Sequence, residues 1–359
     1  MDSGSIFDRQ LSRRRFLATA GVSAGAAALT LANTKCDPAL LRRFQQQKTA
    51  GPPCHRAWVW QFSVDGRPDQ IAASLRPNGL GVMIKTHDGV DWMATYDTSP
   101  SSVSGPRQVQ TLAAQFENAG VPFHAWSVVK GVDAVTEAQM AADVLSAGAR
   151  SLTLDLEGSS GFWLGSRDDA LRFGDELRKR TPFGRVDISI DARPWRINLV
   201  PMNEFVAFTD GIAPQLYWDT FDTQDNVDGY AGSGFPAGPD GMTPEFLVNA
   251  TAQLLAPYGR AIIPAGQGAA ADPSTWPRFV FAAWVAGMIE VSSWRYGVTP
   301  RDTLAYLGRN RAGTRPATPP PTPTPQTSRT PTPSSTSRPT RTPTNTPTPT
   351  PSATPTPTP

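Results

Sequence analysis

Residues 151–157 read SLTLDLE, a short run of mainly apolar and β-branched side chains that ends in two carboxylates. Its length is typical of a strand rather than a helix. Similar runs recur along the chain, separated by helical stretches, at residues 57–62, 81–86, 122–129, 186–191, 211–218, 261–266 and 289–294. This alternation predicts about eight strands joined by helices.

The runs lie within a body of roughly 250 residues, from residue 55 to residue 311, which is the usual size of one (β/α)8 barrel. We therefore expect the fold class α/β, with a single TIM barrel and a substantial core. An open, doubly wound sheet is the alternative. No glycine-rich phosphate loop follows the first run, which disfavours that sheet and any nucleotide-binding role.

Helix signals occupy the stretches between the runs. Capping boxes and Thr-Pro steps predict helix starts at Thr136 with Gln139, Ser166 with Asp169, residues 243–244 and residues 299–300. Apolar side chains recur at helical spacing at Val109, Leu112, Ala113 and Phe116, and again at Ala170, Phe173 and Leu177. Each such helix has one apolar stripe to pack on the sheet.

An export signal is predicted at the start of the chain. Residues 12–17 read SRRRFL, the twin-arginine pattern, and the stretch from there to residue 32 is uncharged and rich in small residues. We expect residues 1–32 to be a signal peptide for the twin-arginine export machinery, and the protein to be secreted or at the cell surface. A basic turn before a buried helix is the alternative, and an uncleaved signal could act as an anchor.

Two further segments flank the body. Residues 33–54 are predicted to be a linker arm, and a disulfide between Cys36 and Cys54 suits an exported chain, whereas a catalytic thiol beside His55 is the alternative. Residues 312–359 are dominated by Thr, Pro, Ser and Arg, which is typical of an extended, disordered stalk.

Composition and motifs exclude several classes of function. The formal net charge is only +2, too small to indicate nucleic-acid binding. None of the three histidines forms a helical pair with metal-ligand spacing, and no Gly-x-Ser-x-Gly motif occurs. We expect no metal, no other cofactor, and a monomer.

Functional side chains of such a barrel lie at the C-terminal ends of the strands. The polar residues predicted at these ends are Lys85, His87, Asp88, Asp155, Glu157, Asp191, Gln215, Tyr217, Asp219, Gln267 and Arg295. Asp155 and Glu157 are two residues apart, so on a strand both carboxyls face the barrel mouth. Their repulsion and burial would leave one protonated beside one ionised, the pair that glycoside hydrolysis uses. The alternative is a structural pair that is neutralised by Lys85 or Arg295.

Six of the ten tryptophans lie in or just after the same strand ends: Trp92, Trp126, Trp163, Trp195, Trp218 and Trp294. Any one of them could belong to a core, but sugar rings stack on aromatic faces, and the shared location predicts a carbohydrate cleft. The glycine- and aspartate-rich residues 222–239 are a candidate loop over that cleft.

Three segments resemble motifs of the Chalaropsis-type lysozymes, and more distantly of chitinase-type barrels, in the same order along the chain. They are GVMIKTHDG at residues 81–89, LDLEG at residues 154–158 and IAPQLY at residues 212–217. The resemblance implies cleavage of a β-linked amino sugar in a polysaccharide or peptidoglycan, by a retaining or neighbouring-group-assisted route.

The resemblance also implies roles for single residues. Glu157 would donate the proton, Asp155 would orient or stabilise, and Asp191 and Tyr217 would contact the reacting sugar. The remaining substrate contacts are expected from Lys85, Asp88, Gln215, Asp219, Trp163, Trp195, Trp218, Gln267 and Trp294.

One departure from the lysozyme pattern stands in the first strand. Such lysozymes carry an Asp there, but residues 58–62 read WVWQF. Asp65, Asp191 or Asp219 could substitute, or the barrel no longer cleaves. Three functions therefore stay open: a glycosidase, a sugar-binding barrel without catalysis, and a structural surface protein on its stalk. A protonated Glu157 that faces a second carboxylate within reach favours the enzyme, and an acid pair locked by Lys85 or Arg295 favours binding. A rim without a cleft favours the third.

Overall fold

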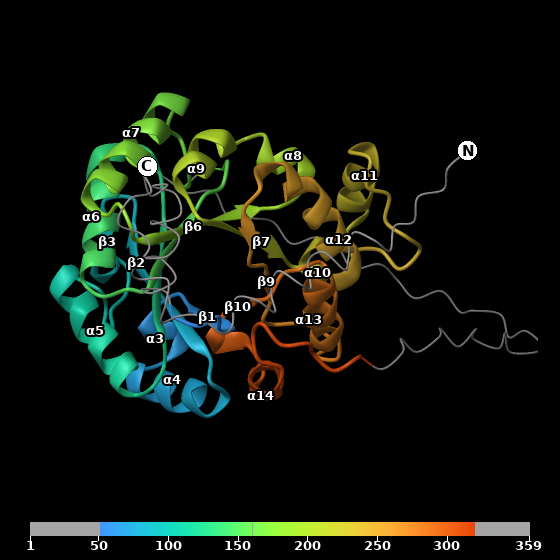
Figure 1. The fold of residues 1–359 in the computed structure, drawn as a ribbon, viewed down its shortest axis with the longest axis horizontal. Helices are drawn as coiled ribbons and strands as arrows, with labels where there is room; N and C mark the ends of the chain where they lie inside the picture. The colour runs from blue at the N-terminus through green and yellow to red at the C-terminus, as the bar shows by residue number, and fades with distance from the viewer. Residues whose placement is uncertain (1–50, 160, 320–359) are drawn as a thin grey trace, which may run out of the picture. The chain divides into compact units, whose positions relative to one another are not determined.

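Parallel strands alternate with helices along the described residues, 51–159 and 161–319, of the computed structural model (Figure 1). The expected signal segment, the linker arm up to residue 50 and the tail beyond residue 319 lie outside these residues, so those assignments stay predictions. None of the described helices has the length and apolarity that crossing a membrane requires.

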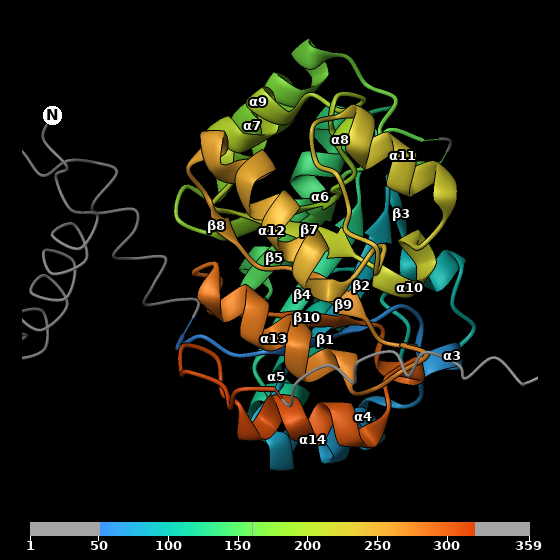
Figure 2. The ribbon, with the colours of Figure 1, turned by 90° about the vertical axis from the view of Figure 1, so that its right-hand side faces the viewer.

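The strands close into a parallel barrel with eight positions, which confirms the predicted fold class. Pairing runs in the order β1-β10-β9-β7-β6-β5-β4-β2 and returns to β1. Figure 2 shows strands such as β4, β7 and β10 near the centre of the body, among the helices. The barrel strands are β1 (Arg56–Val59), β2 (Gly81–Asp88), β4 (Phe123–Val128), β5 (Ser151–Asp155), β6 (Arg185–Asp191), β7 (Gly211–Leu216), β8 (Ala261–Ile262), β9 (Ala265–Gln267) and β10 (Ser292–Trp294). Because β8 and β9 both pair with β7, they share one position. The short β3 (Asp91–Trp92) pairs antiparallel with the end of β2.

Helices surround the barrel on its outer side (Figure 1). The longer ones are α4 (Pro68–Leu75), α5 (Pro106–Asn118), α6 (Ala134–Ser146), α7 (Arg167–Arg180), α9 (Met202–Phe208), α11 (Gln224–Gly232), α12 (Pro244–Leu255), α13 (Thr275–Val285) and α14 (Arg301–Arg309). Single turns of helix are α3 (Phe62–Asp65), α8 (Pro194–Ile197), α10 (Trp218–Phe221) and the 3-10 turns Arg76–Asn78, Met93–Thr95, Ala256–Tyr258 and Tyr296–Val298.

Two of the four predicted helix starts are confirmed. Ser166 and Asp169 form a capping box at α7, and Thr243 caps α12 ahead of its first-turn proline. The other two are wrong by a few residues. Asp133 caps α6, because its carboxylate accepts the Thr136 N–H, and α14 begins at Arg301 with Pro300 as its N-cap. Asp133 lies three residues before Thr136 and caps the helix there, so Thr136 lies inside the first turn of α6.

The core has two parts. The larger one lies between barrel and helices and includes Val109 and Phe116 of α5 and Leu152 and Leu154 of β5. Burial of each such side chain contributes roughly 1.5–3 kcal/mol to the free energy of unfolding. The smaller part fills the barrel interior near the mouth and consists of Trp58, Met83, Trp126, Val128 and Ala265, with Phe162 and Trp294 against it.

Both ends of the described body meet at the barrel end opposite the mouth. The His55 ring is 2.7 Å from the Asn310 carbonyl oxygen, and the Gly313 N–H donates to the Ile289 carbonyl. Arg315 lies over the Trp284 ring, 5.6 Å from its centroid, so contacts with the barrel continue past the expected boundary at residue 311. Cys54 is buried with its sulfur 3.8 Å from His124 Nε2. Its expected partner, Cys36, lies outside the described residues.

Candidate active site

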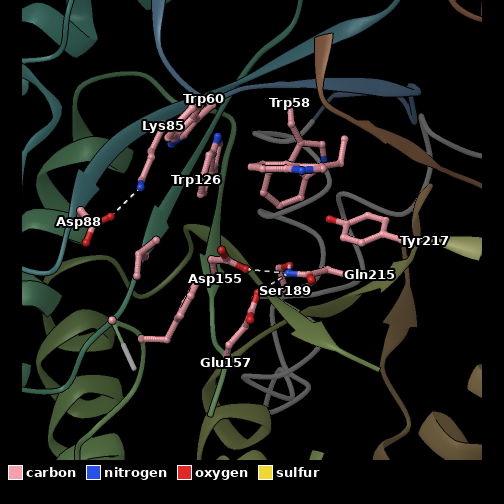
Figure 3. A pocket seen from close by; sticks show the side chains of 14 residues that line it. Trp58, Trp60, Lys85, Asp88, Trp126, Asp155, Glu157, Ser189, Gln215 and Tyr217 are labelled. Carbon is pink, nitrogen blue, oxygen red and sulfur yellow. Dashed lines mark hydrogen bonds and ion pairs between the residues drawn. The ribbon is translucent and has the colours of Figure 1, made fainter. Parts of the chain in front are cut away.

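A cavity of about 350 Å³ opens at the C-terminal ends of the strands, where the sequence predicts the site (Figure 3). Side chains from most of the barrel strands converge on it. Its walls are Trp58, Trp60, Lys85, Asp88, Trp126, Val128, Asp155, Glu157, Gly161, Phe162, Ser189, Gln215, Tyr217 and Trp294. Seven of the predicted site residues therefore lie together, and they come from segments up to about two hundred residues apart in sequence, which parallel barrel topology allows.

Asp155 and Glu157 form the acidic wall of this cavity. Asp155 is the last residue of β5 and Glu157 follows it by two positions, so both side chains point inward. The Gln215 side-chain amide donates to both: Nε2 is 3.2 Å from Asp155 Oδ1 and 2.8 Å from Glu157 Oε1 (Figure 3). Gln215 thus bridges the two carboxyls, whereas the sequence predicted it only as a substrate contact.

Burial raises the proton affinity of both carboxyls. It raises the pKa of Asp155 to about 7, and the charge of Glu157 acts in the same direction. The pKa of Glu157 is also raised, again chiefly by burial. The Gln215 hydrogen bonds oppose both shifts, because they stabilise the ionised forms. The pair therefore retains a proton in a pH range where isolated carboxyls have lost theirs.

The cations that could lock the acid pair are engaged elsewhere. Lys85 Nζ is 2.6 Å from Asp88 Oδ2, and Lys130 Nζ is 2.6 Å from the other oxygen of Asp88. Arg295 forms an ion pair with Asp65. Within the described residues, neither Asp155 nor Glu157 forms an ion pair, so the structural alternative of a pair locked by Lys85 or Arg295 does not hold.

Three tryptophans make the apolar wall. Trp58, Trp126 and Trp294 meet edge to face, with ring centroids 5.3–5.7 Å apart. Their indole N–H groups are partly used for anchoring: Trp58 donates to the Ser292 hydroxyl and Trp126 to the Val59 carbonyl. The sequence predicted Trp126 and Trp294 near the mouth but missed Trp58. Its signal was the two-residue spacing of Trp58, on β1, and Trp60, directly after the strand.

Tyr217 and Ser189 complete the lining beside Gln215. Burial raises the pKa of Tyr217 well above its usual range, so the phenol stays protonated at neutral pH and can donate a hydrogen bond. Figure 3 shows the Tyr217 hydroxyl directed into the pocket. Ser189 precedes the predicted Asp191 by two positions on β6 and hydrogen-bonds to Asp155, a role that the sequence reading missed.

Three predicted tryptophan contacts need correction. Trp163 is 5% exposed and packs on Phe205, and Trp218 is 2% exposed and packs on Trp276 and Phe279, so neither offers a face to a sugar. Trp195 packs edge-on against Tyr230 and stands outside the cavity wall. These residues follow strand ends in sequence, but the loops turn them outward onto the helices.

The predicted acids Asp191 and Asp219 also stand outside the cavity wall. Asp191 pairs with the Arg193 guanidinium at 2.5 Å. The Asp219 carboxylate accepts from Gln267 Nε2, at 3.0 Å, and from the Ala271 N–H. With Asp65 held by Arg295, none of the three candidate substitutes for a first-strand Asp reaches the pocket. Trp58 and Trp60 occupy that side instead.

Residues 222–239 do not line the cavity. They contain α11, and the side chains at its start contribute to a separate surface depression with Arg193 and Trp195. Among the described residues, no group of three or more His, Cys, Asp or Glu side chains is placed to hold a metal ion. His87 is buried beside Thr86, and His124 hydrogen-bonds to Ser151 at the opposite end of the barrel.

The fold and this pocket define the chain as a (β/α)8 barrel with a paired-carboxylate site at its mouth. No protein-family model matches the chain, and neither does any curated protein. Solved structures that resemble it include glycoside hydrolases.

Active domain 2 of a Pyrococcus furiosus chitinase is 11% identical, with 73% of this chain and 96% of that one covered and a TM-score of 0.48. A mannanase catalytic domain from Streptomyces sp. SirexAA-E is 13% identical, with 68% and 75% covered and a TM-score of 0.39. An HpcH/HpaI aldolase/citrate lyase family protein from Burkholderia cenocepacia is 15% identical, with 70% and 92% covered and a TM-score of 0.38. Such distant likenesses concern the barrel and leave the activity to be inferred from the site.

Proposed function

We propose that this protein is an exported glycoside hydrolase that cleaves a β-linked amino-sugar glycan of a cell wall or extracellular matrix. One observation carries the proposal. Asp155 and Glu157 share the Gln215 amide in a cavity with an aromatic wall, and neither forms an ion pair with another described residue. Buried acids without a counter-ion lower stability, and such arrangements cluster at catalytic sites.

Glu157 is the better placed proton donor of the two. Its side chain is only partly buried, whereas Asp155 lies deeper, at 7% exposure. A protonated Glu157 transfers its proton to the glycosidic oxygen as the bond to the anomeric carbon breaks. With the one proton of the pair on Glu157, the ionised Asp155 stabilises the positive charge that develops on the reacting sugar, and the Tyr217 hydroxyl donates a hydrogen bond to a sugar oxygen.

The attack on the anomeric carbon is assigned to the substrate's own acetamido oxygen. A single amide nitrogen contacts both carboxyls, so their accepting oxygens lie within about 6 Å, closer than the roughly 6.5–9.5 Å of inverting enzymes. The remaining wall carboxylate, Asp88, is held by two lysines. Among the described residues, no free carboxylate lines the cavity across from Glu157, so neighbouring-group assistance suits the site. The acetamido oxygen bonds to the anomeric carbon as the glycosidic bond breaks, and water, which gives its proton to the Glu157 carboxylate, then opens this intermediate. The route requires an N-acetylated sugar.

The resemblance to Chalaropsis-type lysozymes adds support through the segments at residues 81–89, 154–158 and 212–217, all of which contribute to the pocket walls. The first strand departs from that family. Peptidoglycan and chitin-type glycans are therefore both proposed substrates, and export through the twin-arginine pathway and display on the Pro/Thr-rich tail belong to the same proposal.

A sugar-binding barrel without catalysis is the second candidate. The observation that favours it lies at the first strand and the residue after its end, where Trp58 and Trp60 line the cavity and no acid does. An aromatic wall binds sugar rings whether or not the bond is cut.

The test is release of reducing ends from peptidoglycan, β-linked N-acetylglucosamine oligomers and unacetylated β-glycans, by the chain from residue 33 onward. We expect cleavage of an N-acetylated substrate, and Glu157→Gln should lower the rate by about 10²–10⁴-fold while leaving binding intact. Glu204→Gln, at a surface ion pair with Arg167, is the matched control. Binding without cleavage by the wild type would establish the second candidate.

A further inference from the structure

Trp60 has the most exposed side chain of the ten tryptophans. It is 38% exposed, while the other nine are buried or only partly exposed. It also lines the cavity, at the point where the chain leaves β1. Single exposed hydrophobic residues are common and need no explanation, but a large aromatic ring at the rim of a cavity is a typical ligand contact.

Two buried carboxylates fix the loop that carries Trp60. Asp65 accepts the Trp60 backbone N–H at 2.6 Å and pairs with Arg295, which follows β10. The Arg295 guanidinium lies over the Trp60 ring, 5.5 Å from its centroid. Asp97 accepts the backbone N–H of Phe62 at 2.7 Å.

Two buried carboxylates are an unusual way to hold a surface loop. Asp65 and Asp97 are 6% and 4% exposed, and burial of a carboxylate costs free energy unless its partners compensate. Here the partners are backbone amides of the loop and one guanidinium, so the carboxylates hold the loop in a single conformation. Because Arg295 lies over one face of the indole, a ligand would stack on the other face of a ring whose backbone is already held, at a small cost in conformational entropy.

Trp60 is also remote from the acids. In Figure 3 it lies at the opposite end of the pocket from Glu157, with Trp126 between them. A sugar ring placed for proton donation by Glu157 would contact the inner wall of tryptophans and leave Trp60 to another part of the ligand.

We propose that Trp60 is a stacking platform for a second sugar ring, so that the site binds an oligosaccharide of two or more units. The ligand class is a β-linked glycan whose pyranose ring presents an apolar face to the indole. The inference rests on the proposed function and specifies how that site recognises its substrate.

The test compares binding of β-1,4-linked N-acetylglucosamine as monomer and tetramer by titration calorimetry. The full chain carries Glu157→Gln throughout, so that no ligand is consumed. We expect Trp60→Ala to weaken tetramer binding about tenfold and to leave monomer binding unchanged. Trp60→Phe should recover most of the loss, because it retains a ring. Trp284→Ala is the matched control, since Trp284 also lies beneath an arginine but far from the cavity.

Three outcomes would overturn the inference. Unchanged tetramer binding by Trp60→Ala would show that the ring is not a contact. Equal weakening of monomer and tetramer would place Trp60 at the first ring or in the fold, and an unfolding midpoint unchanged from the parent would separate these two. Absence of binding by the parent, to either ligand, would remove the proposed function together with this subsite.

Discussion

The two ends of the barrel bury charge in opposite ways. At the end opposite the mouth, Arg56 Nη2 is 2.5 Å from Glu290 Oε2, and Arg185 is 3.3 Å from Asp187. At the mouth, Asp155 and Glu157 share a neutral amide. The carboxylates at both ends are largely shielded from water. The two ends therefore differ in the group that contacts the carboxylates, a guanidinium or a neutral amide, and not in how deeply they are buried.

The charges at one end of the barrel serve stability, and those at the mouth serve function. A guanidinium compensates a buried carboxylate, and removal of either member leaves an uncompensated charge. Burial raises the pKa of Asp187 as well, but the charges of Arg185 and Arg56 oppose that shift. The Gln215 amide opposes it less at Asp155, whose pKa rises to about 7. The mouth therefore keeps a proton available near neutral pH, and the opposite end contributes to holding the fold.

The largest effect is expected from Glu290→Gln. The change leaves the buried Arg56 with Asp187, at 3.9 Å, as its remaining acidic partner, and should lower the free energy of unfolding by about 3–5 kcal/mol. Urea denaturation measures it. Asp69→Asn, which breaks an exposed pair with Arg67, is the control and should have no measurable effect. Comparable effects of the two variants would mean that the buried pair does not stabilise the barrel.

Asp155→Asn is expected to act in the opposite direction. The folded-state pKa of Asp155 is raised to about 7 from 3.8, so the unfolded chain ionises first, and the wild type loses stability as pH rises between these values. The variant lacks this penalty. Its advantage should grow from about pH 4 to pH 7 and then level off, on the order of 2–4 kcal/mol. Thermal unfolding across pH 4–9 measures it, and a variant less stable than wild type at pH 8 would contradict the assignment.

Gln215→Leu should have the smallest effect. Loss of the amide donor removes a hydrogen bond that favours the ionised acids, so the proton is held more tightly. The alkaline limb of the pH–rate profile should move to higher pH, with a loss of rate of about tenfold at the optimum. Gln139→Leu, on a helix away from the mouth, is the control. An alkaline limb that stays in place, with only the rate reduced, would limit Gln215 to packing.

Strand positions were predictable because each is a local pattern. All eight predicted runs contain barrel strands, and the stripes of α5 and α7 are buried as expected. The carboxylate pair was predictable for the same reason, since Asp155 and Glu157 are separated by the two-residue period of a strand.

Loop residues were predicted less well. Trp163 and Trp218 follow strand ends in sequence, yet both are buried in the outer core. Trp58, which lies inside the barrel, was not predicted. Position after a strand says that a residue is near the mouth, but the direction of its side chain depends on how the loop packs.

The amino-acid sequence by itself determined the barrel, the end at which the site lies and the acid pair, because these follow from periodicity within single segments. The tertiary structure alone decided which side chains surround that pair. Gln215 reaches the acids across 60 and 58 positions of sequence, and Asp65 meets Arg295 across 230. Such contacts depend on the closure of the barrel, which brings strands from both ends of the chain side by side.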